Sequence, residues 1–326
     1  MNPLLRIISY SRAQDVPPLP GTDAFHSVEL LHVLQLTPGY APLLLVAFEG
    51  EVPVGKMLCI CRYNRRLLGI SDKSYVYGTG EYFPSSVPRD QIFRDLLAHF
   101  TACYKHRSLF LEFRNLQDSL FGYRYFREEG YFPVRWLRVR NSIHHATADK
   151  WMSTSRKRQI ARGLKNGAVM DEARTMEDAH AFFNLCRKYY SAKIYRYVPD
   201  VRFFLSLLIE PHGQKLGKIF VIRHKDKIIG GSVCLFSGKD VYLILSCGMR
   251  KSYPLQYPGV LAVWAAMNYA HRNGYEHFEF IDAGLPFKKY TYRDFILRFG
   301  GKQLASRRWF RVRIGWINRL LTWLYV

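Results

Sequence analysis

The feature that most constrains the fold is an internal repeat, because both halves of the 326-residue chain show the same order of sequence patterns. In the second half, residues 217–236 form two alternating apolar runs around a Lys-Asp-Lys turn, which is typical of a β-hairpin. The region after it predicts a strand over 240–248, a helix over 258–274, a strand over 275–284, a short helix over 292–301 and a final strand over 305–313. In the first half the corresponding elements are a hairpin over 41–61, a strand over 74–80, a helix over 88–107, a strand over 108–115, a short helix over 119–130 and a strand over 132–140.

Individual residues support a duplication over a chance likeness of short strands. The matching pairs are Gly55 and Cys59 with Gly230 and Cys234 at an offset of 175, residues 136–140 with 309–313 at 173, and Glu112, Phe113 and Asn115 with Glu279, Phe280 and Asp282 at 167. The length also favours two domains. We therefore expect an α/β fold of two tandem domains with mixed central sheets, spanning 1–147 and 148–326.

The net charge of +22 is uneven along the chain. Residues 1–145 carry 17 Lys and Arg against 13 Asp and Glu, whereas residues 146–326 carry 31 against 13. Such a basic second half predicts an acidic partner, such as a phosphorylated cofactor, tRNA, an acyl carrier protein, an anionic membrane surface or a pyrophosphate-bearing substrate. Charge alone does not choose among them.

A basic helix is predicted over 153–167, with Ser153 or Thr154 as its N-cap. Arg158, Arg162 and Lys165 share one face of it, and no acidic residue lies between 150 and 170. This face is either a solvated surface or a binding surface, and Arg158 is a candidate substrate contact.

The chain resembles the FemAB-like branch of the GNAT acetyltransferase superfamily. The resemblance rests on the order of four motifs, which are SRKRQIARGLKNG (155–167), IFVIRHKDKIIGGSVCLF (219–236), YAHRNGYEHFEFIDAG (269–284) and RFGG (298–301). It implies two GNAT-like domains and transfer of an acyl or aminoacyl group onto an amine. The acceptor would be a small molecule or a cell-envelope precursor, and the donor an acyl-CoA or an aminoacyl-tRNA.

The chain departs from the family where the donor binds. GNAT proteins that use coenzyme A usually have a glycine-rich loop before the central helix, but residues 250–259 contain one glycine and two prolines. This departure weakens acyl-CoA as donor without excluding acyl transfer. The expected donor contacts are Ser246, Gly248, Arg250, Lys251 and Gly259.

The family often has a lysine where this chain has Ile296, so Lys289 or Arg298 is expected to take over contacts to the donor or the oxyanion. The alternative is a protein that keeps the fold, binds RNA or an acidic partner, and has lost catalysis.

Asp282 is the candidate general base. It ends a predicted strand, on the same face as Phe278 and Phe280, and apolar neighbours raise the pKa of a carboxylate. The competing interpretation is a cap of the following turn, since Asp before Ala-Gly is a common turn opening.

Two further groups are candidate acceptor contacts. Lys193, Tyr195 and Arg196 form a basic and aromatic loop that suits a phosphate or carboxylate, although cations also favour a helix C-terminus. Arg114 and Asn115 end the corresponding strand of the first domain, where they either bind a ligand or tie down a loop.

The remaining features indicate a cytoplasmic protein. The six cysteines form no CxxC pair, no metal site is suggested, and neither an export signal nor a membrane-spanning stretch is evident. The tail at 314–326 has aromatic ends, so it either packs as the last element of its domain or contacts the inner face of the membrane.

Overall fold

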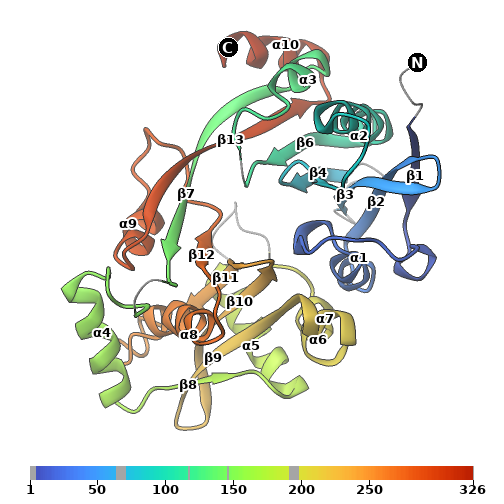
Figure 1. Cartoon of the computed structure of the whole chain (residues 1–326). Coiled ribbons are helices and arrows are strands. Elements are labelled where there is room, and N and C mark those ends of the chain that lie inside the picture. The colour runs from blue at the N-terminus through green and yellow to red at the C-terminus, as the bar shows by residue number, and fades with distance from the viewer. Residues whose placement is uncertain (1–4, 64–70, 117, 145–146, 191–197, 326) are drawn as a thin grey trace. The chain divides into compact units, whose positions relative to one another are not determined.

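The computed structural model describes residues 5–63, 71–116, 118–144, 147–190 and 198–325. They belong to two compact units (Figure 1). Unit 1 comprises residues 1–136 and 305–326, and unit 2 comprises residues 137–304. Each unit contains a mixed sheet with helices, which confirms the expected α/β class of tandem domains.

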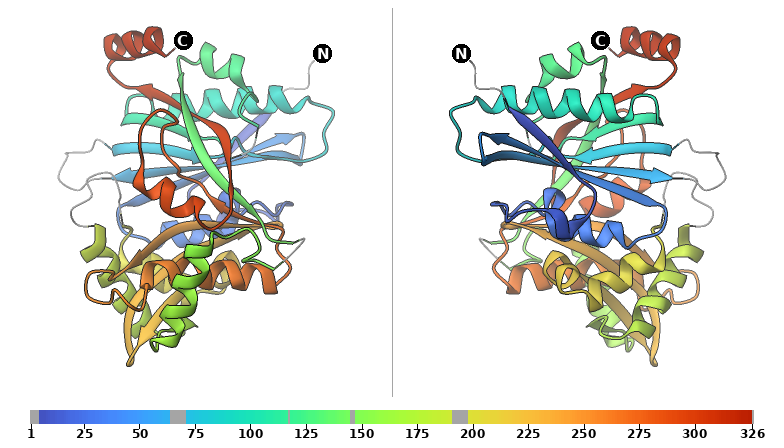
Figure 2. Two further views of the ribbon diagram at one scale, coloured as in Figure 1. Left: turned by 90° about the vertical axis from the view of Figure 1, so that its left-hand side faces the viewer. Right: turned by 90° about the vertical axis from the view of Figure 1, so that its right-hand side faces the viewer.

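Unit 1 has the strand order β1-β2-β3-β4-β6-β13, with β5 beside β3. Neighbours are antiparallel except for β4 and β6, which are parallel because helix α2 connects them. The strands are β1 (Arg6–Tyr10), β2 (Tyr40–Glu49), β3 (Val52–Tyr63), β4 (Ser71–Tyr77), β5 (Glu81–Tyr82), β6 (Ser108–Arg114) and β13 (Lys302–Val312). The helices are α1 (Val28–Gln35), α2 (Arg89–Tyr104), α3 (Tyr123–Glu128) and α10 (Gly315–Leu324), with short 3-10 turns at Ala13–Asp15 and Ala24–His26. Helix α2 packs against β2, β3 and β6 (Figure 2).

Unit 2 repeats this plan with the strand order β8-β9-β10-β11-β12-β7. Here β11 and β12 are the parallel pair, and helix α8 connects them. The strands are β7 (Phe132–Ser142), β8 (Val169–Glu172), β9 (Gly217–His224), β10 (Lys227–Ser237), β11 (Asp240–Gly248) and β12 (His277–Phe280). The helices are α4 (Thr154–Lys165), α5 (Met176–Tyr190), α6 (Val201–Ile209), α7 (Pro211–Leu216), α8 (Pro258–Arg272) and α9 (Thr291–Leu297).

The last strands of the two units are exchanged relative to the sequence halves. Strand β7, expected to close the first domain, enters unit 2 at Leu137 and pairs with β12 through Val139–Ser142. Strand β13, expected to close the second domain, pairs with β6. The compact units therefore differ from the predicted domains 1–147 and 148–326, because hydrogen bonding assigns each strand to the unit formed by the other half of the sequence.

The exchanged strands also correct one offset of the repeat. Trp309 pairs with Phe113 in unit 1, and Val139 pairs with Phe280 in unit 2. The structural offset between β7 and β13 is therefore 170, and the 173 of the sequence comparison is wrong by three residues. Both strands carry similar aromatic and basic residues, so the sequence comparison could not distinguish the offset of 173 from that of 170.

The match of Gly55 with Gly230 in the repeat has a structural basis in both units. A Cβ on Gly55 would lie 2.9 Å from Ile92 in the first turn of α2, and one on Gly230 would lie 2.9 Å from the carbonyl oxygen of Pro258 at the start of α8. Both glycines let the connecting helix approach the sheet closely.

Each unit buries a glutamate on the strand that follows its long connecting helix, α2 or α8. Glu112 of β6 forms ion pairs with Lys73, Arg114 and Arg308, and Glu279 of β12 forms ion pairs with Arg138 and Arg140. Burial opposes the charge of Glu112, but the three cations together hold the pKa of Glu112 well below its usual value. Burial dominates at Glu279 and raises its pKa despite the two arginines.

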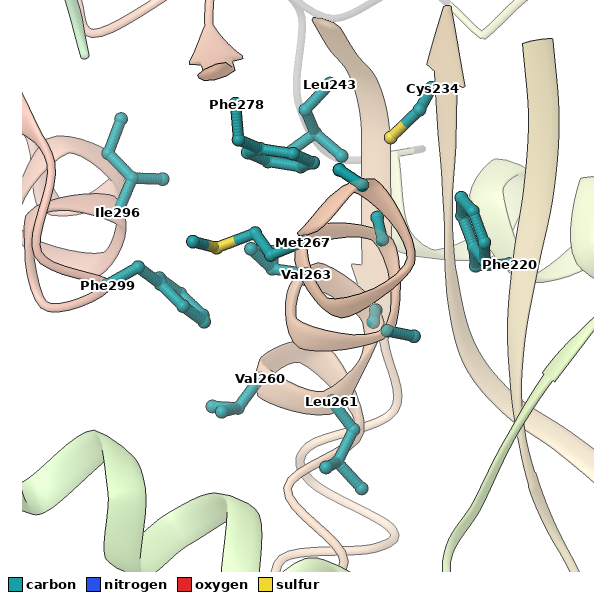
Figure 3. Packing of buried hydrophobic residues seen from close by; sticks show 14 of the residues in the cluster. Phe220, Cys234, Leu243, Val260, Leu261, Val263, Met267, Phe278, Ile296 and Phe299 are labelled. Atoms are coloured by element: carbon teal, nitrogen blue, oxygen red, sulfur yellow. The ribbon is translucent and has the colours of Figure 1, made fainter. Parts of the chain in front are cut away.

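Helix α8 forms the centre of the core of unit 2. Its Val263 and Met267 pack with Phe278 of β12 and Leu243 of β11 in one buried cluster (Figure 3). Within the described ranges, no helix is long and apolar enough to cross a membrane.

Candidate functional site

The parallel pairing of β11 and β12 stops halfway along β11. The ladder runs from Asp240 opposite His277 to Leu243 opposite Phe280, where β12 ends, while β11 continues to Gly248. A bulge against β10 leaves Ile244 as an extra residue at this point. Beyond Leu243, β11 has no pairing with β12 among the described residues, so the sheet is open on this side of β11.

Gly248 ends this open segment against the first turn of α8. A Cβ on Gly248 would lie 2.7 Å from the Cα of Gly259, whereas a Cβ on Gly259 would meet no atom within 4 Å. The structure therefore brings two of the expected donor contacts together, with open space beside Gly259. The carbonyl of Ser246, a third, accepts a 2.6 Å hydrogen bond from the phenol of Tyr190 in α5.

We expect Gly248→Ala to lower the free energy of unfolding by about 1–3 kcal/mol, because the added methyl group forces α8 away from β11. Gly259→Ala is the matched variant and should leave the stability unchanged or slightly raised, since its site is open. If the open space holds the donor, Gly259→Ala should weaken donor binding in a folded protein. Chemical denaturation and donor titration of both variants check this, and equal stability of the two would contradict the close approach.

In the loop that follows, residues 249–257, several backbone N–H groups form hydrogen bonds within the protein. The N–H groups of Met249, Arg250, Ser252 and Tyr253 donate to carbonyls of Ile229, Gly248 and Met249, at 2.8–3.2 Å. Pro254 and Pro258 have no N–H group. Four of the eight N–H groups of the loop are therefore used within the protein, which reduces the backbone donors that a pyrophosphate could use.

Helix α4 supports this loop and adds charge beside it. Ser153 caps α4 as expected, accepting from the N–H of Arg156, and at the other end Asn166 donates to the carbonyl of Leu255 at 2.9 Å. Gly163 packs against the backbone of Gln256.

The cations of this region are mostly exposed. Arg158, Arg162 and Lys165 on α4, and Arg250 and Lys251 in the loop, all have exposed side chains. The fixed contacts between α4 and the loop hold these cations on one part of unit 2, where side chains rather than backbone would bind an anionic donor.

Arg156 is a buried cation that the sequence did not single out. Its guanidinium lies 4.5 Å and 4.4 Å from the ring centres of Phe295 and Phe299, and it donates to the carbonyl of Phe295. Burial and the nearby charge of Arg298 lower the pKa of Arg156 to about 10. Arg156 thus links α4 to α9.

Asp282 follows β12 and is half-buried. Phe278 and Phe280, which precede it at alternate positions, are buried in the core. Arg293 of α9 fixes the segment after Asp282 by donating to the carbonyls of Ala283, Leu285 and Lys288. These contacts give the candidate base a defined backbone.

The other two candidate catalytic residues, Lys289 and Arg298, have exposed side chains. Their part in catalysis stays a prediction. The backbone carbonyl of Arg298 accepts from the N–H of Ser153.

Arg114 and Asn115 have structural partners within unit 1. Arg114 pairs with Glu112 and donates to Tyr77 at 2.7 Å, and Asn115 donates to the carbonyl of Asp118 at 2.7 Å. These contacts favour the tie-down interpretation over ligand binding. Lys193, Tyr195 and Arg196 lie outside the described residues.

Residues 154–289, which contain the open end of β11 and the loop before α8, match the family model described as an acetyltransferase (GNAT) domain. This segment is similar to GNAT domains. The match supports an acyltransferase, as the sequence predicted. No curated protein sequence matches the chain.

Solved structures share the fold over nearly the whole chain. FemX is 11% identical with a TM-score of 0.65, covering 93% of this chain and 95% of FemX. The tandem GNAT protein from the clavulanic acid biosynthesis pathway is 13% identical with a TM-score of 0.57, covering 95% and 99%. L-PGS from Bacillus licheniformis is 10% identical with a TM-score of 0.58, covering 90% and 91%. The resemblance to the FemAB-like branch of the GNAT fold is thereby confirmed.

Proposed function

We propose that the chain transfers an aminoacyl group from aminoacyl-tRNA to an amine acceptor. The observation that carries this choice of donor is the loop at 249–257, which contains Pro254, lacks a glycine and uses four of its eight N–H groups internally. A coenzyme A pyrophosphate relies on such N–H groups, whereas a long polyanion is also bound by spaced side-chain cations. The exposed cations of α4 and of the loop suit the second kind of donor.

In the proposed reaction, the neutral amine attacks the ester carbonyl of the aminoacyl-tRNA. A C–N bond forms, and Asp282 accepts the proton that the amine loses. The tetrahedral intermediate collapses, the ester C–O bond breaks, and the proton passes to the leaving ribose oxygen. Backbone groups of β11 beyond Leu243, which lack pairing with β12 in the described structure, are candidates to stabilise the oxyanion.

The acceptor is proposed to be a cell-envelope precursor that carries an amine. The resemblance to peptidoglycan aminoacyltransferases suggests this class, and the reaction would take place in the cytoplasm, where aminoacyl-tRNA is made. Acyl-CoA and an acylated carrier protein are the alternative donors.

A second candidate function is binding of RNA or an acidic partner without catalysis. A continuous β11–β12 ladder through Gly248 would favour it, because no backbone would then be open to a reacting group. The interrupted ladder supports the enzyme instead.

The donor can be identified by supplying the full-length chain with labelled aminoacyl-tRNA, acyl-CoA or acylated carrier protein, each with an amine-bearing envelope precursor fraction. We expect the label to move to the acceptor only from aminoacyl-tRNA. Transfer from acyl-CoA alone would overturn the proposed donor, and binding of tRNA without transfer from any donor would favour the binding protein.

The charge-reversal variant Arg158→Glu/Arg162→Glu should weaken tRNA binding by about tenfold and reduce the dependence of affinity on salt, because two phosphate contacts are lost. Arg202→Glu/Lys215→Glu is the matched control, since both side chains are exposed elsewhere in unit 2, on α6 and α7. Filter binding across a salt series measures the effect. Equal losses in the two variants would mean that only net charge matters.

A further inference from the structure

A cavity of about 100 Å³ in unit 1 is lined by the end of α2, the first half of β6, the end of β13 and the first turn of α10. Its lining contains no acidic residue and four residues that can carry positive charge, namely Lys105, His106, Arg311 and Arg313. Sites for whole small molecules usually measure about 300–1,000 Å³, so this cavity has room for one small group.

Hydrogen bonds fix the walls of this cavity. The N–H of Arg313, just after β13, donates to the carbonyl of Leu109 in β6 at 3.0 Å. Helix α10 packs on unit 1, as one interpretation of the tail expected, because Asn318 accepts from the N–H of Val312 at 2.8 Å and donates to the carbonyl of Gly130 at 2.9 Å. The backbone that carries the cations is therefore held in place before any ligand binds.

The positive charge of the cavity has no carboxylate to balance it. Within the described part of the chain, none of the four side chains that can be cationic forms an ion pair. Arg311 donates instead to the backbone carbonyl of Glu129. The C-terminal end of α2 favours the two cations that follow it, but it does not account for Arg311 and Arg313 at the end of β13. Cations held together without a counter-ion repel one another, so a bound anion would be stabilised here.

Other groups in the lining suit the oxygens of a phosphate. Ser108 is 1% exposed and contributes a buried hydroxyl, and Gly315 brings the first turn of α10 to the cavity. Ile314, before Gly315, provides no side-chain cap, so no capping side chain takes up the first N–H groups of this helix. Phosphate oxygens accept from such N–H groups and from guanidinium groups.

We propose that this cavity binds a phosphate group, as free phosphate or as a phosphate monoester. A dianion of this size balances the charge of the lining. Because His106, Arg313 and Gly315 are exposed, the rest of an ester can project into solvent. The site is separate from the candidate acceptor contacts of unit 1, since Ser108 begins β6 and Arg114 ends it. The proposal does not depend on the proposed donor or reaction.

Calorimetric titration of the full-length chain with inorganic phosphate and with glycerol 3-phosphate, at constant ionic strength, tests the proposal. We expect binding and a raised melting temperature, which sodium chloride at the same ionic strength does not produce. Lys105→Gln/Arg313→Gln should weaken binding by about tenfold or more, because two charge-assisted contacts are lost. Arg313→Gln alone, at an exposed side chain, repeats the test with the least effect on folding. Tighter binding of the ester would identify a monoester as the ligand, and tighter binding of inorganic phosphate would identify the free ion.

Arg319→Gln is the matched control, because Arg319 is an exposed arginine of α10 that does not line the cavity. It should bind phosphate like the unaltered chain, and circular dichroism should show that all variants are folded. The proposal is overturned if neither compound binds, or if sodium chloride stabilises the chain equally. It is also overturned if Lys105→Gln/Arg313→Gln binds unchanged, or loses no more affinity than Arg319→Gln. The cavity variants should leave aminoacyl transfer unaltered, so a failure of phosphate binding is distinguished from a failure of the transfer assay.

Discussion

We expect Asp282→Asn to lower the single-turnover rate of transfer by about 10²–10⁴-fold, the usual contribution of a positioned general base. The neutral amine loses a proton as the C–N bond forms, and an amide side chain cannot accept that proton. The half-buried place of Asp282 after β12, on a backbone fixed by Arg293, makes the position suitable for this role. Donor affinity should change little, since the loop and α4 are untouched.

Asp294→Asn is the control for this variant, because Asp294 is an exposed carboxylate on nearby α9. Its rate should equal that of the unaltered chain. If Asp282 is a turn cap, Asp282→Asn or Asp282→Ala will instead lower the unfolding free energy by at most about 1 kcal/mol with little change in rate. An unaltered rate for Asp282→Asn would remove the residue from the mechanism.

Glu112→Ala should be the most destabilising single change considered, lowering the unfolding free energy by about 3–5 kcal/mol. Glu112 is fully buried and is the shared partner of Lys73, Arg114 and Arg308. Its removal leaves three partly or largely buried cations close together without a carboxylate. Burial and the charge of Arg114 already lower the pKa of Lys73 to about 8, so this lysine is sensitive to the loss.

The pH dependence of Glu112→Gln separates the charge from the packing. The folded pKa of Glu112 lies below its unfolded value of about 4.3, so its charge stabilises the fold above that pH and this stabilisation is lost as the pH falls. The stability difference between the unaltered chain and Glu112→Gln should therefore be largest near neutrality and shrink below about pH 4. Glu51→Gln, at a side chain that is 89% exposed, should show almost no difference at any pH. A gap at Glu112 that is independent of pH would show that charge is not its cause.

Much of the fold could be predicted from local patterns. The hairpins, α8 with Pro258 at its start, and the cap of α4 by Ser153 follow from alternation, helical spacing and capping residues, all of which act over a few positions. The repeat and the order of its elements predicted the tandem α/β class and the GNAT resemblance. The candidate site could also be predicted in part. Gly248 and Gly259 lie at the ends of predicted elements, and the cations of α4 share one face of a predicted helix.

Other features depend on contacts between distant residues. Strands β7 and β13 have similar aromatic and basic patterns, so only hydrogen bonding to β12 and β6 decides which unit each one completes. Likewise, the sequence shows Arg114 and Asn115 at a strand end, but only the structure shows their partners Glu112, Tyr77 and Asp118, which favour a structural role.

For α10, the sequence determined an amphipathic helix with Asn318, Arg319 and Thr322 on its polar side, but not which side unit 1 covers. The tertiary structure decided this through Asn318, whose two hydrogen bonds turn one side of the helix toward unit 1 and leave Trp316 and Trp323 exposed. Local patterns determine which elements form, since they depend on neighbouring residues. Which face, edge or side chain remains available for function depends on long-range packing, which no short stretch of sequence specifies.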